Sequence, residues 1–77
     1  MKIEILGVGC HKCKQLAANA ESAVKDLNVP AEIGKVADID RITEYGVMMT
    51  PALVINGKVV SVGKVLSKEE IKNIINS

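Results

Sequence analysis

One stretch of helical periodicity restricts most strongly what this chain can fold into. Over residues 13–27, apolar side chains recur at steps of three and four, the spacing of one helix face. Asn28 and Pro30 then end the predicted helix. Short segments at residues 3–6 and 31–36 favour β-strands on either side of it. A helix between two strands predicts a βαβ unit with parallel strands.

The middle of the chain predicts a short helix followed by a β-hairpin. Asp38 or Asp40 can cap a helix through Ile39, Ile42 and Tyr45, and Gly46 would terminate it. Residues 52–62 consist of an apolar run, the dipeptide Asn56-Gly57 and a second β-compatible run. Because Asn-Gly strongly favours a two-residue turn, these runs should form an antiparallel hairpin.

The last segment predicts a helix and completes the fold class. Ser67-Lys68-Glu69-Glu70 has the pattern of a capping box, and Leu66 and Ile71 are spaced as a hydrophobic staple. The predicted order is therefore β-α-β-α-β-β-α. We expect an α/β fold, a small three-layer sandwich with a four-stranded mixed sheet, in one domain spanning residues 1–77.

Composition excludes several functional classes. The 77 residues carry a formal net charge of +1 and a single aromatic side chain, Tyr45. This balance offers neither the basic patch nor the stacking surface that nucleic acids require. The first seven residues are too short for the apolar core of a signal peptide, and no later run is long enough to span a membrane. We therefore expect a cytoplasmic monomer that binds neither nucleic acid nor membrane.

Two cysteines three positions apart, Cys10 and Cys13, carry the main functional signal. Cys13 is in step with the apolar stripe of the predicted helix, so we expect it to be buried. Cys10 falls at or before the first helical residue and should be presented to partners. Unpaired backbone N–H groups at a helix start stabilise a thiolate there, with secondary help from the positive charge of Lys12 and of His11 when it is protonated.

This asymmetry predicts dithiol chemistry. Cys10 would attack a substrate disulfide and form a mixed disulfide, which Cys13 would resolve by closing the Cys10–Cys13 ring. The redox-active disulfide would be the only cofactor, with no bound metal. A structural zinc site is the simplest alternative, but it needs two further ligands, and His11 is the only histidine.

Together, the element order, the Cys10-His11-Lys12-Cys13 turn and Thr50-Pro51 before the third predicted strand resemble the thioredoxin fold. The chain is most similar in size to small glutaredoxin-like thioredoxins of archaea and bacteria. The resemblance implies a protein-disulfide reductase acting on disulfide-containing client proteins, with a thioredoxin-reductase-like flavoprotein as electron donor. It also implies that Pro51 is cis against the active-site disulfide and that the Thr50 backbone pairs with substrate.

The chain departs from both parent families around the site. Gly9 stands where thioredoxins have a tryptophan, and His11-Lys12 replaces their Gly-Pro. The stretch Val62-Gly63-Lys64-Val65 differs from the glutathione-binding pattern of glutaredoxins, so glutathione has little support.

Three further residues have two interpretations each. Glu4 matches by count the buried acid of thioredoxins and could accept a proton from Cys13, but its spacing equally fits a solvent-facing strand residue. Met48 and Met49 could line an apolar substrate surface, although we expect them to fill the core.

Two other functions remain open. Small copper chaperones carry a similar cysteine loop, and thiolates suit Cu(I), but their order is β-α-β-β-α-β, without a late hairpin and a final helix. A non-catalytic redox-sensing module could use the same fold as a catalyst.

Overall fold

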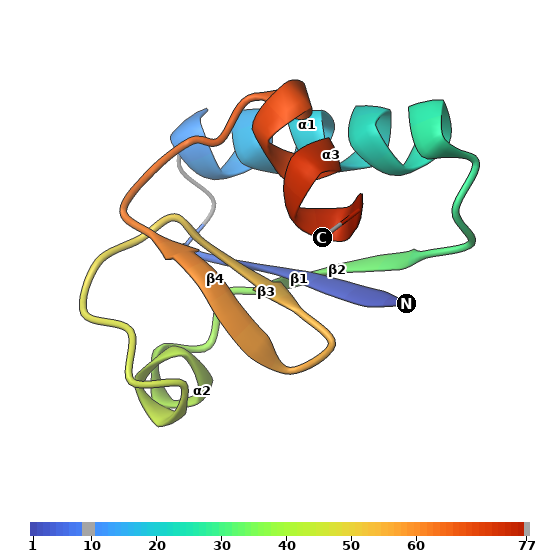
Figure 1. Cartoon of the computed structure of the whole chain (residues 1–77). Coiled ribbons are helices and arrows are strands. Elements are labelled where there is room, and N and C mark those ends of the chain that lie inside the picture. Colours follow the sequence, from blue (N-terminus) through green and yellow to red (C-terminus); the bar gives the residue numbers. More distant parts are fainter. Residues whose placement is uncertain (9–10, 77) are drawn as a thin grey trace.

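The structure of the chain is a computed structural model that describes residues 1–8 and 11–76. Over these residues the elements follow the predicted order (Figure 1). They are β1 (Lys2–Leu6), α1 (His11–Leu27), β2 (Glu32–Val36), α2 (Ile39–Glu44), β3 (Ala52–Ile55), β4 (Lys58–Val62) and α3 (Lys68–Asn76).

The four strands form one mixed sheet in the order β2-β1-β3-β4. β1 and β2 run parallel, as the predicted βαβ unit requires, and Ile5 lies opposite Lys35 in their register. β3 is antiparallel to both β1 and β4. Asn56 and Gly57 both have positive φ angles, 52° and 83°, which is the conformation that a type I′ hairpin turn demands.

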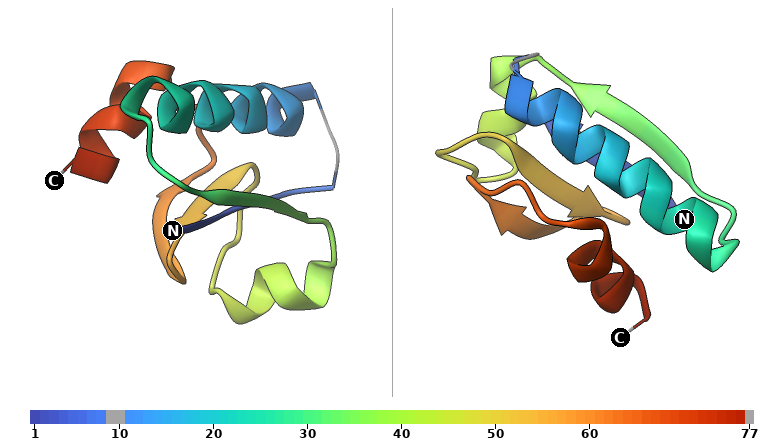
Figure 2. Two further views of the ribbon diagram at one scale, coloured as in Figure 1. Left: turned by 90° about the vertical axis from the view of Figure 1, so that its right-hand side faces the viewer. Right: turned by 90° about the horizontal axis from the view of Figure 1, so that it is seen from above.

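Helices cover both faces of the sheet, which confirms the three-layer architecture. α1 and α3 lie side by side on one face, whereas α2 lies on the other (Figures 1 and 2). The core is divided accordingly. The larger cluster, under α1 and α3, contains Ile3, Ile5, Leu16, Ala17, Ala20, Ala23, Leu53, Leu66 and Ile71. The smaller cluster, under α2, contains Leu6, Val36, Ile42, Val47, Ala52 and Val54.

The ends of α1 and α2 are fixed by local chemistry. Asn28 adopts a left-handed φ of 55°, its N–H donates to Lys25 O, and the Val29 N–H donates to Val24 O. This pair of bonds is the Schellman motif that ends α1 where predicted. At α2, Asp38 rather than Asp40 is the N-cap, because its Oδ1 accepts the Asp40 N–H at 3.0 Å.

Polar contacts join α1 to α3 and the loop before it. Asn19 Nδ2 donates to Leu66 O at 2.8 Å, and Lys68 Nζ lies 2.8 Å from Asp26 Oδ2. The Lys68 ammonium holds the pKa of Asp26 below its ordinary value. Both partners of the ion pair are partly exposed, so salt should weaken it.

The predicted capping box is present at α3. The Glu70 N–H donates to Ser67 Oγ and the Ser67 N–H donates to Glu70 Oε1, each at 3.1 Å. We expect Ser67→Ala to lower the free energy of unfolding by ~1 kcal/mol, measured by urea denaturation, because an N–H of the first turn loses its acceptor. Ser22→Ala, on the exposed face of α1, is the matched control and should cost nothing. Equal stability of both variants would contradict a capping role.

Candidate redox site

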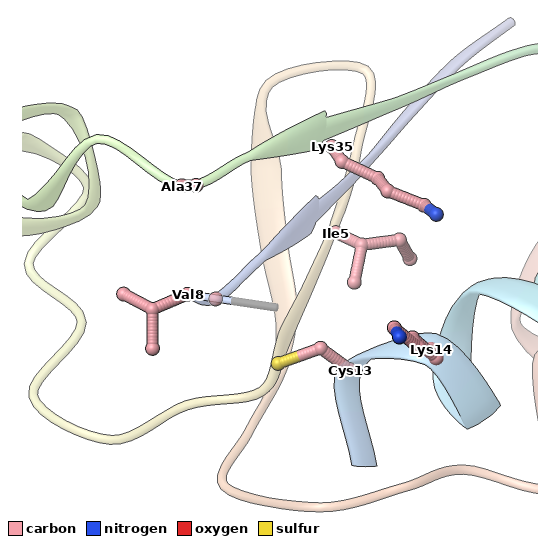
Figure 3. A pocket seen from close by; sticks show the side chains of 7 residues that line it. Ile5, Val8, Cys13, Lys14, Lys35 and Ala37 are labelled. Atoms are coloured by element: carbon pink, nitrogen blue, oxygen red, sulfur yellow. The ribbon is translucent and has the colours of Figure 1, made fainter. Parts of the chain in front are cut away.

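Cys13 lies in the first turn of α1, and its side chain is 6% exposed. Figure 3 shows its sulfur directed away from α1 toward the end of β1, where Val8 lies. The burial predicted from the helical stripe is confirmed. Cys10 lies outside the described residues, so its presentation as the attacking thiol stays a prediction.

Gly7 brings Cys13 and Thr50 together. Gly7 is buried just after β1, where its N–H donates to Val36 O at 2.9 Å. A Cβ atom built on Gly7 would run into Cys13 Sγ and would lie 3.8 Å from Thr50 Cβ. The cysteine of α1 and the residue before Pro51 therefore flank the same glycine, although they are far apart in the sequence.

The Thr50-Pro51 peptide bond is cis, as the family resemblance implies. Pro51 is fully buried and Thr50 is exposed. The Gly63 N–H donates to Pro51 O at 2.8 Å, which ties this turn to the end of β4. An exposed threonine thus lies across Gly7 from the buried Cys13 sulfur, and the Pro51 carbonyl that follows it is held by β4.

A pocket of about 160 Å³ opens beside Cys13 (Figure 3). Its lining residues are Ile5, Gly7, Val8, Cys13, Lys14, Lys35 and Ala37. The pocket is smaller than the cavities of several hundred Å³ that hold drug-sized ligands. Lys14 and Lys35 are the two positively charged side chains of this lining.

The rim of the site carries exposed apolar side chains. Met48 is 92% exposed, and Val8, Ile39 and Met49 are each more than 60% exposed. Met48, Val8 and Ile39 also line a shallow cavity of about 290 Å³ that reaches Thr50. The expectation that Met48 and Met49 fill the core is therefore wrong, because both project from the loop that leads to Pro51.

Glu4 is 6% exposed, so its interpretation as a solvent-facing residue is also wrong. Its Oε1 accepts the Tyr45 hydroxyl at 2.7 Å, and its Oε2 lies 3.7 Å from Arg41 Nη2. This hydrogen bond, with a contribution from burial, raises the pKa of Tyr45 above its ordinary value.

These partners place the Glu4 carboxylate on the α2 side of the sheet. Its neighbours Ile3 and Ile5 pack in the opposite core, under α1. Successive strand residues point to opposite faces, so β1 separates Glu4 from the face that carries Cys13. Direct proton transfer between Glu4 and Cys13 does not fit this arrangement.

The other predicted site residues lie at the surface. His11 and Lys12 occupy the first two positions of α1 and are exposed. Within the described residues, no three His, Cys, Asp or Glu side chains gather into a cluster that could hold a metal ion. Across the same ranges, no helix has both the length and the apolar character needed to cross a membrane.

Sequence reasoning missed two residues at the site, Gly7 and Lys35. Lys35 could have been found from the parallel register, because it pairs with Ile5 on the strand face beneath α1. A glycine after a short strand, such as Gly7, indicates by its sequence position only backbone freedom at the strand end. Its lack of a side chain is instead what lets Cys13 approach β1.

Comparison with known proteins agrees with this geometry. Residues 1–76 match the thioredoxin domain family. A thioredoxin of Methanothermobacter thermautotrophicus is 45% identical over 76 residues, which cover 99% of each chain. A thioredoxin of Methanocaldococcus jannaschii is 43% identical over 75 residues, covering 97% of this chain and 86% of the relative. The chain therefore belongs to the thioredoxin domain family, a family of thiol–disulfide oxidoreductases.

Proposed function

We propose that this protein reduces disulfide bonds of client proteins through Cys10 and Cys13. Cys10 attacks one sulfur of the client disulfide, so that the other client sulfur leaves as a thiolate and a mixed disulfide forms. Cys13 then attacks Cys10 Sγ, forms the Cys10–Cys13 disulfide and releases the second client thiolate. A flavoprotein of the thioredoxin-reductase class would supply two electrons to regenerate the dithiol. A cytoplasmic setting suits this chemistry, because reduced thiols are maintained there.

The main support for this proposal is that Cys13, Gly7 and Thr50 lie close together in the structure. The residue that would resolve the mixed disulfide is buried at the start of α1, and Gly7 alone separates it from the exposed residue that precedes the cis-proline. An extended client segment running past Thr50 would therefore bring its disulfide toward the cysteine turn.

The exposed apolar rim supports protein clients rather than small disulfides alone. Met48, Ile39 and Val8 offer apolar surface next to Thr50, and methionine adapts its shape to different partners. A client with apolar residues around its disulfide would cover this rim on binding.

We expect Met48→Lys to lower kcat/KM for insulin reduction about 5-fold, which corresponds to ~1 kcal/mol of lost contact. The lysine replaces apolar contact area with a charge that the client would have to desolvate. Asn73→Lys, which adds the same charge on an exposed position of α3, is the control and should leave kcat/KM unchanged. Both variants should reduce a small aromatic disulfide at the parent rate. An equal loss with both substrates would refute a docking role for Met48.

The proposal is tested by turnover. The reduced protein is mixed with insulin and dithiothreitol, and precipitation of the released insulin B chain is followed over time. The expected result is many insulin molecules reduced per protein molecule, and none above background with Cys10→Ser. A stoichiometric reaction that stops after one cycle would instead indicate a redox-sensing module.

The copper-chaperone alternative is disfavoured by topology. The late β3–β4 hairpin and the final α3 differ from the β-α-β-β-α-β order of those chaperones. Cu(I) titration of the reduced parent protein provides the direct check. Tight one-to-one binding together with absent insulin turnover would replace the oxidoreductase assignment.

A further inference from the structure

We infer that Gly7 is a positioning residue for the resolving step, because its missing side chain creates the space that the Cys13 sulfur occupies. This inference rests on the proposed dithiol function but concerns a residue outside the cysteine pair. Its basis is the close approach between Gly7 and Cys13 Sγ.

Backbone conformation does not account for a glycine at this position. Gly46, Gly57 and Gly63 have positive φ angles, which are strained for other residues, whereas Gly7 does not. Alanine could therefore adopt the Gly7 backbone without local strain. An alanine at this position would instead collide with one side chain. Its Cβ would overlap Cys13 Sγ and lie 3.4 Å from Cys13 Cβ.

The Gly7 backbone is held in place, whereas the Cys13 sulfur can leave its position by rotating toward the pocket that it lines. The Gly7 N–H is bonded to Val36 O, which fixes the end of β1 against β2. Cys13 is 6% exposed and begins the apolar stripe of α1, which continues into the core through Leu16 and Ala17. A methyl group at residue 7 must therefore rotate the Cys13 side chain or move the start of α1.

Either displacement changes the reaction geometry. In the resolving step the Cys13 thiolate attacks Cys10 Sγ of the mixed disulfide, the Cys10–Cys13 bond forms, and the client sulfur leaves with the electron pair of the broken bond. Displacement of a reacting atom by about 1 Å can slow such a step about 100-fold. The first attack, by Cys10, does not use the Cys13 sulfur.

The test separates the two steps with 5,5′-dithiobis(2-nitrobenzoate). Cys10 releases one thionitrobenzoate when it attacks this disulfide, and Cys13 releases a second when it resolves the product. We expect Gly7→Ala to slow the second release about 10- to 100-fold and to leave the first within about 2-fold. Gly34→Ala on β2 is the matched control, because a Cβ there meets nothing within 4 Å. If Gly7→Ala releases the second thionitrobenzoate as fast as the parent protein does, the inference is overturned.

A stability cycle covers the case in which Gly7→Ala folds poorly. Urea denaturation is measured for Gly7→Ala in the parent and in a Cys13→Ala background, where no sulfur obstructs the new methyl group. The loss of stability should largely disappear in that background, and an equal loss in both, or failure of the double variant to fold, would overturn the inference. If the parent lacks a second release, the proposed function fails, while this cycle still tests the contact.

Discussion

Cys13→Ser is expected to lower repeated insulin reduction by at least about 100-fold while leaving Cys10 able to form a mixed disulfide with the client. Cys13 is held beside Gly7 at the start of α1, so in the proposed mechanism it would resolve the mixed disulfide as an intramolecular neighbour. Serine has nearly the same size but cannot form a disulfide. Only external dithiothreitol would then release the client, at a much lower effective concentration.

The measurement combines two readouts. Insulin turnover gives the loss of activity, and non-reducing electrophoresis detects the trapped complex between Cys13→Ser and insulin. Cys10→Ser is the control and should show neither turnover nor a trapped complex. Parental turnover by Cys13→Ser, or a complex trapped through residue 13 in Cys10→Ser, would contradict the roles assigned to the two cysteines.

The fold could be predicted because its signals are local and mutually consistent. The α1 stripe, the Schellman end at Asn28, the Asn56-Gly57 turn and the Ser67 capping box each specify one element or boundary. The βαβ rule then fixes the direction of β2. The choice between Asp38 and Asp40 as N-cap stayed open, because each aspartate precedes helical residues and only the backbone geometry distinguishes them.

The site was only partly predictable, because its remaining features depend on which layer each residue faces. The helical period correctly placed Cys13 inside the protein. Alternation along β1 separates Glu4 from Ile3 and Ile5, but it does not say whether the other face meets water or a helix. Burial of Glu4 depends on the cover that α2 and Tyr45 provide. Likewise, the composition of the loop before Pro51 does not reveal that Met48 projects outward.

Tyr45→Phe is the second substitution with a large expected effect, on stability. The mostly buried Glu4 would lose the hydroxyl that donates to its Oε1, so the free energy of unfolding should fall. The double variant Glu4→Leu/Tyr45→Phe removes both polar partners and should recover much of that loss in urea denaturation. If the stability losses of the two single variants simply add in the double variant, the hydrogen bond between Glu4 and Tyr45 does not contribute to stability.

The hydrogen bond between Glu4 and Tyr45 should also make the free energy of unfolding depend on pH in the alkaline range. Tyr45 is the only aromatic residue, so ultraviolet absorbance reports its ionisation without interference. The Glu4 carboxylate raises the pKa of Tyr45 above its ordinary value of 10.0, so the folded protein holds this proton more tightly than the unfolded chain does. The resulting stability is complete below pH 10 and is lost as the pH rises through the folded pKa. Glu4→Gln should return the absorbance midpoint toward that of an exposed tyrosine, and an unchanged midpoint would show that the carboxylate does not control this proton.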